Sequence, residues 1–233
     1  MKRTEVCDRG LVRLLSASCD KPPSLRGLVD TDDEMEILAE IEALTGGRLL
    51  AERGRNPHLD PRELAWQRRG RDLRICGESQ VNAAFANTRA GGNRFNTGER
   101  GAWYCAWDGR VAVREVAWHR RRELEYTGCF HDRARYVECL ADVIGLFDDM
   151  TDAPGHPALH PDPAVGYPAG QNLAQELRRA GSPGLIYPSV RAPAPGGTCL
   201  VCFDPQAIRN LRPGACWDLV WEGTPHCAVI AVG

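Results

Sequence analysis

Two arginines stand where a positive charge needs a partner. Arg94 follows a pair of glycines within residues 91–96, Gly-Gly-Asn-Arg-Phe-Asn. Glycines let the backbone approach a ligand closely, and the planar guanidinium group suits a pyrophosphate. Arg13 lies inside the apolar run of residues 11–15, where a permanent charge is costly unless an anion or a carboxylate pairs with it. The sequence therefore allows either an anion site or two structural ion pairs.

Glu115 is the candidate catalytic carboxylate. Ala112, Glu115, Val116 and His119 follow helical spacing within residues 110–125, so they share one helix face. If that face packs on a sheet, the carboxylate points inward and must be hydrogen-bonded, paired with an arginine or functional. His119, one turn farther along, is more typical of helix packing than of a proton shuttle.

Ser189 follows an apolar strand that stops at Pro188. A serine so exposed at a strand end could bind a ligand. The surrounding residues do not form a nucleophile elbow, so an acyl-enzyme mechanism is not indicated. From the local sequence alone the turn is structural.

Strands and helices must bring these residues together. Apolar runs bounded by glycine and proline predict strands, and apolar residues at helical spacing predict helices. Residues 135–144 fit either a strand or a helix, and residues 48–80 are arginine-rich and weakly periodic, typical of a side wall rather than of core. The strands are expected at residues 11–15, 103–107, 184–187, 198–203, 217–221 and 227–232, and the helices at 31–44, 110–125 and 171–180, with a short helix after Pro61. Neither a repeat nor a long linker interrupts them, so one α+β domain is expected.

Composition restricts the class of protein. The 233 residues are 43% hydrophobic and 26% charged, with a formal net charge of −2 from 29 basic and 31 acidic residues. Such a balance gives no overall field toward nucleic acid or membrane. No run approaches the roughly 18 apolar residues of a membrane span, and the first residues lack the apolar run of a signal peptide. The sequence therefore predicts a cytoplasmic protein that binds neither nucleic acid nor membrane.

The ten cysteines are expected to be reduced. Cys199 and Cys202 have the spacing of a metal-binding or redox pair, but they lie in an apolar, strand-like run. Residues three apart on a strand point to opposite faces, so one site could hardly use both. No second ligand pair follows at zinc-site spacing. We therefore predict core cysteines and no metal site.

Taken in chain order, these segments resemble the RES-domain family, which is named for an arginine, a glutamate and a serine. Arg13, with the proline pair at residues 22–23, looks like the family's first arginine. The other motifs that carry the resemblance are the Gly-Arg-aromatic-Asn segment around Arg94, the strand at Trp103-Tyr104, the helix of Glu115 and the turn Tyr187-Pro188-Ser189.

The resemblance implies a fold and a function. The fold would be like that of the ADP-ribosyltransferases, an α+β core of two small packed sheets flanked by helices. The protein would be the toxin of a bacterial type II toxin–antitoxin system, with a helix-turn-helix antitoxin of the Xre type. It would cleave NAD at the nicotinamide–ribose bond, with water or inorganic phosphate as acceptor. A protein mono-ADP-ribosyltransferase with the same site, or a non-catalytic interaction module with the same fold, is the alternative.

The resemblance also implies roles for residues. Glu115 would stabilise the oxocarbenium-like sugar, as carboxylates do in glycoside hydrolysis. Arg13 and Arg94 would bind the pyrophosphate, Tyr104 would stack on nicotinamide or ribose, and Ser189 would hydrogen-bond the ribose or the carboxamide. The expected catalytic set is Arg94, Glu115 and Ser189, and the expected NAD-binding set is Arg13, Arg94, Phe95, Asn96, Tyr104 and Ser189.

The spacing departs from compact members of the family in two places. A long segment separates Arg13 from Arg94, and we expect a helical insertion at about residues 31–80 to occupy it. The proline-rich segment at about residues 153–168 is expected to be an irregular loop added to the domain. Residues 1–233 would then form a single RES domain.

Overall fold

The computed structural model describes residues 1–17, 31, 34, 46–65, 77–192 and 197–232. Apart from Thr31 and Glu34, the helix expected at residues 31–44 lies outside the described residues, and so do the prolines at 22–23. The strands are β1 (Lys2–Ser16), β2 (Trp103–Ala106), β3 (His131–Asp149), β4 (Gly184–Pro188), β5 (Thr198–Cys202), β6 (Ile208–Glu222) and β7 (Cys227–Val232). The helices are α2 (Gly47–Glu52), α3 (Glu78–Ala86), α4 (Gly109–Thr127) and α5 (Pro163–Arg179), with short 3-10 turns η3 (Pro61–Glu63), η4 (Pro157–Leu159) and η5 (Pro205–Ala207).

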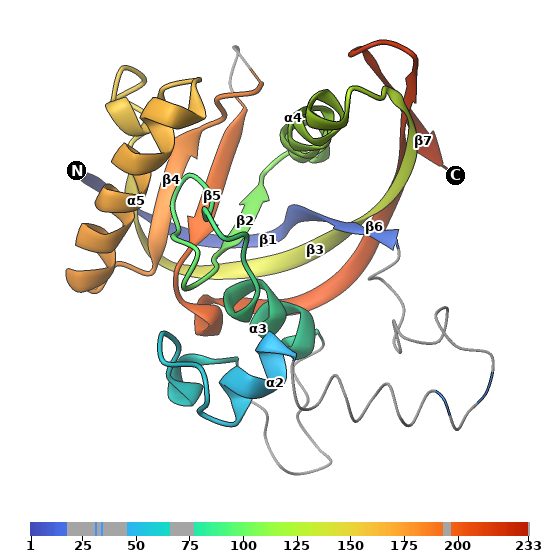
Figure 1. Ribbon diagram of the computed structural model, residues 1–233. Coiled ribbons are helices and arrows are strands. Elements are labelled where there is room, and N and C mark those ends of the chain that lie inside the picture. Colours follow the sequence, from blue (N-terminus) through green and yellow to red (C-terminus); the bar gives the residue numbers. More distant parts are fainter. Residues whose placement is uncertain (18–30, 32–33, 35–45, 66–76, 193–196, 233) are drawn as a thin grey trace.

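The strands form two groups that meet to enclose a core (Figure 1). Long antiparallel strands β1, β3, β6 and β7 make one group, and β2, β5 and β4 make the other. Two short junctions join the groups into one hydrogen-bonded sheet. β3 runs parallel to β4 over two residue pairs, and β1 meets β2 at the single pair Val12–Ala106. The α+β class is confirmed.

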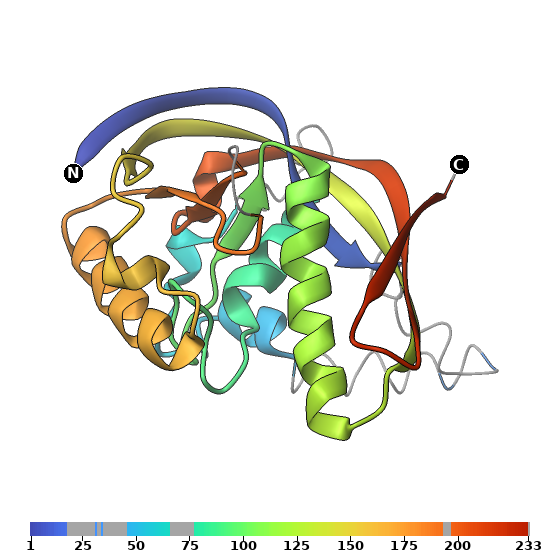
Figure 2. The same ribbon diagram turned by 90° about the horizontal axis from the view of Figure 1, so that it is seen from above.

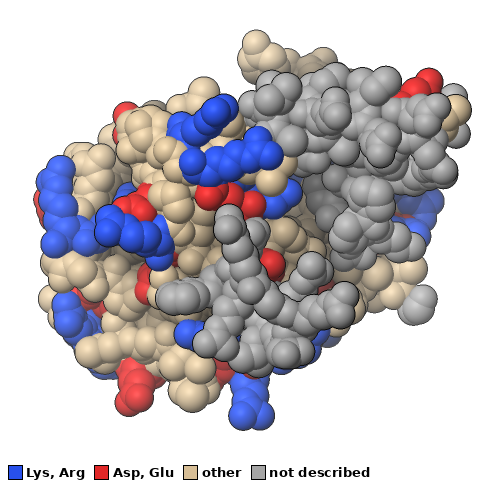
Figure 3. All heavy atoms as spheres, turned by 90° about the horizontal axis from the view of Figure 1, so that it is seen from below, with Lys and Arg blue, Asp and Glu red and all other residues tan. Residues whose placement is uncertain are grey.

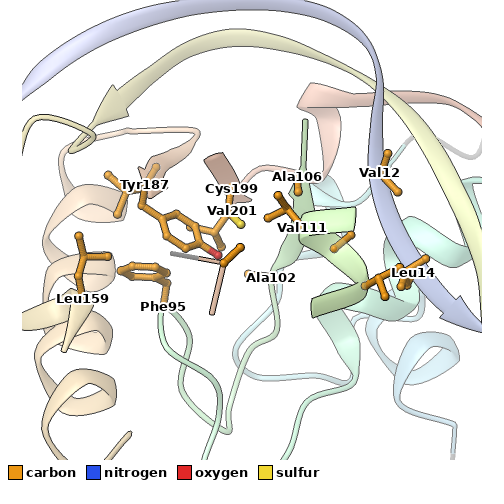
Figure 4. Packing of buried hydrophobic residues seen from close by; sticks show 14 of the residues in the cluster. Val12, Leu14, Phe95, Ala102, Ala106, Val111, Leu159, Tyr187, Cys199 and Val201 are labelled. Carbon is orange, nitrogen blue, oxygen red and sulfur yellow. The ribbon is translucent and has the colours of Figure 1, made fainter. Parts of the chain in front are cut away.

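Side chains of β2 and β5 alternate between two hydrophobic clusters. Trp103 and Cys202 face the cluster between the strand groups, which α2 and α3 also cover. Ala106 and Cys199 face the cluster beneath α4 and α5, part of which Figure 4 shows around Tyr187. Cys199 and Cys202 are thus free thiols buried on opposite faces of the sheet, as the spacing predicted.

The prediction that residues 48–80 form a side wall rather than core is wrong for the described part of that segment. Ala51 is fully buried and Leu64 is 5% exposed, and both pack in the cluster between the strand groups. Helix α3, which was not predicted, adds Val81 and Phe85, each 0% exposed. These apolar residues are few and irregularly spaced among arginines, so no periodicity revealed them.

Two boundaries also differ from expectation. The ambiguous residues 135–144 belong to β3, a strand of 19 residues whose outward charged side chains conceal the alternation. Arg133 and Arg135, for example, both pair with Asp218 of β6. On the face drawn in Figure 3, acidic side chains lie beside basic ones.

Helix α5 begins at Pro163 rather than at the predicted residue 171. The Asp162 side chain accepts a hydrogen bond from the Ala164 N–H, and Pro163 occupies the first helical position, where its fixed φ suits a helix. The irregular loop expected to reach about residue 168 therefore ends at Asp162, where the helix is capped. Within the described residues, no helix is both long and apolar enough to cross a membrane.

Candidate active site

A cavity of about 230 Å³ collects most of the predicted site residues. Helices α4 and α5 lie on the same side of the sheet, with β2, β4 and β5 between them (Figure 2). Of the predicted set, Arg13, Arg94, Tyr104 and Glu115 line this cavity. The other lining residues include Asn93, His119, Tyr167, Tyr187, Arg191 and Cys199.

Glu115 projects from α4, and Ser189 fixes its carboxylate. The Ser189 Oγ donates a hydrogen bond of 2.6 Å to Glu115 Oε1 and accepts the backbone N–H groups of Arg191 and Ala192. Its single proton is thus directed at the carboxylate. In this arrangement Ser189 holds Glu115, whereas the sequence predicted that its hydroxyl would hydrogen-bond the ribose or the carboxamide of NAD.

The same environment sets the charge of Glu115. Burial raises the pKa of its carboxyl, and the hydrogen bond from Ser189 and the charges of Arg191 and Arg94 oppose that rise. The salt bridge to an arginine, which was the structural alternative for Glu115, is absent from the ion pairs of the described residues. The carboxylate therefore faces the cavity with a hydrogen bond from the neutral Ser189 hydroxyl and without an ion pair among the described residues.

Arg94 is held in a buried loop against α5. Its Nη1 donates to the carbonyl oxygens of Ala158 (2.6 Å) and His160 (3.0 Å). Gly166 and Gly170 of α5 leave room for this loop, because a Cβ on Gly166 would lie 2.5 Å from Arg94 Nη1 and one on Gly170 would lie 2.2 Å from the Arg94 carbonyl oxygen. Two glycines one helical turn apart thus allow Arg94 to reach the cavity.

Phe95 and Asn96 support the loop and do not line the cavity. The Phe95 ring is 1% exposed and packs edge-on against Tyr187, at 4.8 Å between centroids. Asn96 donates to the carbonyl oxygens of Thr97 and Arg100 and accepts the Tyr104 hydroxyl proton at 2.9 Å. Their side chains are placed to shape the Arg94 loop rather than to touch a ligand.

Tyr104 lines the cavity with its aromatic ring. Its hydroxyl donates to Asn96 and accepts the Phe95 N–H at 3.0 Å, so the polar end is already hydrogen-bonded within the protein. Burial raises the pKa of the phenol well above its ordinary value. A neutral aromatic ring that cannot rotate freely is suited to stacking on a planar ligand.

Arg13 lies where β1 and β2 separate after their single residue pair. Its Nη1 donates to the Tyr104 carbonyl oxygen at 3.5 Å, and its guanidinium carbon lies 4.7 Å from the centre of the Trp103 ring. Burial lowers the pKa of Arg13, and its Nε is buried without a hydrogen-bond partner among the described residues. A buried cation of this kind favours a bound anion.

His119 lines the cavity in its neutral form. Burial, with the charges of four nearby arginines, lowers its pKa to about 4 from an ordinary 6.5. A group that resists protonation only when folded makes the protein less stable as pH falls from about 6.5 toward 4, because the unfolded chain then binds more protons.

Replacing His119 with glutamine is expected to flatten that dependence by up to about 3 kcal/mol across this range, from the size of the pKa shift. Urea unfolding at pH 4.5 and pH 7 measures it. His226→Gln, which alters an exposed histidine, is the control and should keep the wild-type dependence. Equal slopes for wild type and His119→Gln would contradict the assignment.

Arg191 is a charged cavity residue that sequence reasoning missed, as it missed Asn93 and Tyr167. It lies two residues after Ser189, and its Nη2 donates to the Pro161 carbonyl oxygen at 2.7 Å. The proximity to Ser189 in sequence was the available signal, because a turn that presents one side chain to a site presents its neighbours as well.

The chain is similar to a known protein family and to a solved structure. A family model described as the RES domain matches residues 71–222. The chain belongs to the RES-domain family. Among solved structures, a chain in the crystal structure of the M. tuberculosis MbcT–MbcA toxin–antitoxin complex is similar at 23% identity and a TM-score of 0.38, covering 57% of this chain and 74% of that one. No curated protein matches the sequence.

The matched RES domain contains Arg94, Glu115 and Ser189, whereas Arg13 precedes it. Strand β1 nevertheless carries Arg13 to the same cavity, because β1 pairs with β3 from Lys2–Asp149 to Ser16–Tyr136. The long segment between Arg13 and Arg94 does not prevent the two arginines from lining one site.

Proposed function

We propose that this RES-domain protein cleaves NAD at the nicotinamide–ribose bond. The observation that carries the proposal is a single carboxylate, Glu115, held by Ser189 in a cavity whose other charged lining residues, Arg13, Arg94 and Arg191, are cations. Such a cavity attracts an anion and places one negative charge beside it. NAD has both features, an anionic pyrophosphate and a sugar that becomes cationic when its bond to nicotinamide breaks.

Glu115 would stabilise that cation. As the bond between the ribose carbon and the nicotinamide nitrogen breaks, the electron pair leaves with nicotinamide and positive charge develops on the sugar. A buried carboxylate held in a fixed position would stabilise this charge more than one in bulk water. Nicotinamide leaves as a neutral molecule, so the reaction needs no general acid.

The remaining residues would orient the substrate. Arg94 and Arg13 would contact the pyrophosphate, and the Tyr104 ring would stack on the nicotinamide or the ribose. Ligand pockets usually measure about 300–1,000 Å³. The cavity, at about 230 Å³, is smaller, so we expect it to take the nicotinamide riboside end while the adenosine end lies outside.

The test is incubation of the purified protein with NAD, with and without inorganic phosphate. Release of nicotinamide with free ADP-ribose means that water is the acceptor, and ADP-ribose phosphate means that phosphate is. If ADP-ribose is instead found attached to protein, the reaction is mono-ADP-ribosyltransfer at the same site. Absence of nicotinamide release under all conditions would refute the proposal.

The biological role we propose is that of a toxin inhibited by an antitoxin of the Xre type. This proposal rests on membership in the RES-domain family, because resemblance to that family implies a toxin paired with an antitoxin. Growth arrest on expression, with a fall in cellular NAD, would support it, and so would relief by a helix-turn-helix protein encoded beside the gene. Growth unaffected by high expression of active protein would count against it.

Replacing Ser189 with alanine is expected to move the acid limb of kcat/KM for NAD to higher pH. The hydroxyl lowers the pKa of Glu115, so its loss raises that pKa, and the active carboxylate forms only at higher pH. A hydrogen bond to a charged group is worth about 1.5–3 kcal/mol, which corresponds to a shift of about one pH unit or more.

The full pH profile is the measurement, with Ser79→Ala, an exposed serine of α3, as the control. Activity of the Ser189 variant should recover partly at high pH. A profile lowered equally at every pH would show instead that Ser189 only maintains the fold.

A further inference from the structure

Arg191 is fixed from two sides. Its guanidinium carbon lies 3.4 Å from the centre of the Trp118 ring on α4, and its Nη2 donates to the Pro161 carbonyl oxygen just before α5. Stacking on an indole ring holds a planar guanidinium in one orientation. Arg191 therefore reaches the cavity as a preorganised group rather than as a mobile surface side chain.

Arg94 and Arg191 are anchored by the same stretch of backbone. The carbonyl oxygens of Ala158 and His160 hold Arg94, and that of Pro161 holds Arg191. In each case a terminal nitrogen binds the protein, and guanidinium groups have five N–H donors in all. The relative position of the two groups is thereby fixed while other donors remain for a ligand.

The two cations lack a compensating ion pair. Neither Arg94 nor Arg191 takes part in an ion pair between described residues. Burial and the charge of Arg94 both lower the pKa of Arg191, and Glu115 opposes them. Two partly buried like charges destabilise each other, and an anion that contacts both would offset that cost.

We propose that Arg191, held by Trp118, forms with Arg94 a two-arginine clamp for the pyrophosphate of the ADP-ribose moiety. Guanidinium groups bind phosphate oxygens through paired hydrogen bonds, so two such groups held by one stretch of backbone can each contact one of two linked phosphates. Arg191 would contact substrate, and Trp118 would be a positioning residue. The identity of the ligand rests on the proposed NAD cleavage, although the clamp itself can be tested without turnover.

The test is calorimetric titration of ADP-ribose, together with steady-state kinetics on NAD. Arg191→Gln is expected to weaken ADP-ribose binding 10- to 100-fold and to reduce the dependence of that binding on salt. Trp118→Leu is expected to weaken binding several-fold and to raise KM for NAD with little change in kcat. Arg191→Lys, which keeps the charge without the planar fork, should fall between wild type and Arg191→Gln. Arg110→Gln removes an exposed arginine of α4 and should bind as wild type does.

Each other outcome is decisive. Wild-type affinity in Arg191→Gln, equal loss in Arg110→Gln, or no ADP-ribose binding by the wild-type protein would overturn the clamp. If Arg191→Gln is unstable in thermal unfolding, Arg191→Lys and Trp118→Leu carry the test, and wild-type affinity in both would overturn the clamp. ADP-ribose binding that depends on Arg191 without any cleavage of NAD would support the clamp and refute the proposed reaction.

Discussion

Replacing Glu115 with glutamine is expected to slow NAD cleavage by about 10²- to 10³-fold, the effect typical of removing one preorganised electrostatic contact from a transition state. The amide oxygen can still accept the hydrogen bond from Ser189, so the site keeps its shape. Only the negative charge facing the developing cation is lost. KM for NAD should change less than kcat, because positive charge moves from the nicotinamide ring onto the sugar beside Glu115 only as the bond breaks.

The unfolding temperature of Glu115→Gln provides a second test. Burial makes the ionised carboxylate of Glu115 costly in the folded protein, which is why its pKa is raised. A neutral amide removes that cost, so at neutral pH the variant should unfold at the same temperature as wild type or higher. Glu125→Gln, on the exposed surface of the same helix, is the matched control and should retain full activity. Undiminished cleavage by Glu115→Gln would remove the basis of the mechanism.

Replacing Gly170 with alanine is expected to lower kcat/KM for NAD by about 10²-fold, although Gly170 does not line the cavity. The added Cβ would lie 2.2 Å from the Arg94 carbonyl oxygen, and backbone on one side or the other must move. A displacement of about 1 Å in a positioning group is enough for such a loss. Most of the effect should fall on the binding of ADP-ribose, because Arg94 moves and Glu115 does not.

Gly155→Ala is the matched control, since a Cβ there meets nothing within 4 Å. It should be as active and as stable as wild type. Far-UV circular dichroism and thermal unfolding would show whether Gly170→Ala remains folded. A folded Gly170→Ala with normal kinetics would mean that the Arg94 loop adjusts without cost.

Periodicity predicted the elements that carry the chemistry. The helix of Glu115 was expected at residues 110–125 and spans Gly109–Thr127, and the strand before Ser189 was expected at 184–187 and spans Gly184–Pro188. Both elements pack one apolar face on a core, and this leaves a clear pattern in the sequence. The inward placement of Glu115 followed from the same pattern.

The sequence did not predict the start of α5, where glycine and proline residues lie within the helix. Pro163, Gly166, Pro168 and Gly170 are typical of a loop, yet they form the first two turns of α5. Pro163 is tolerated because it opens the helix, whereas Pro168 lies inside it and has no structural explanation. The glycines allow close packing against Arg94, a reason that depends on a segment far away in the chain. Arg191 was missed for the same kind of reason, because its partners Trp118 and Pro161 are distant in sequence.

The partners within the site are far apart along the chain, and this has a consequence for synthesis. Ser189 and Glu115 are 74 residues apart, and Arg13 and the Tyr104 carbonyl oxygen are 91 apart. Contacts of such separation form late, because the chain must first close long loops. While residue 189 is still inside the ribosome, Glu115 is already part of the emerged chain but lacks its hydrogen bond from Ser189. We therefore expect the nascent protein to be unable to cleave NAD until Ser189 has left the ribosome and can hydrogen-bond Glu115.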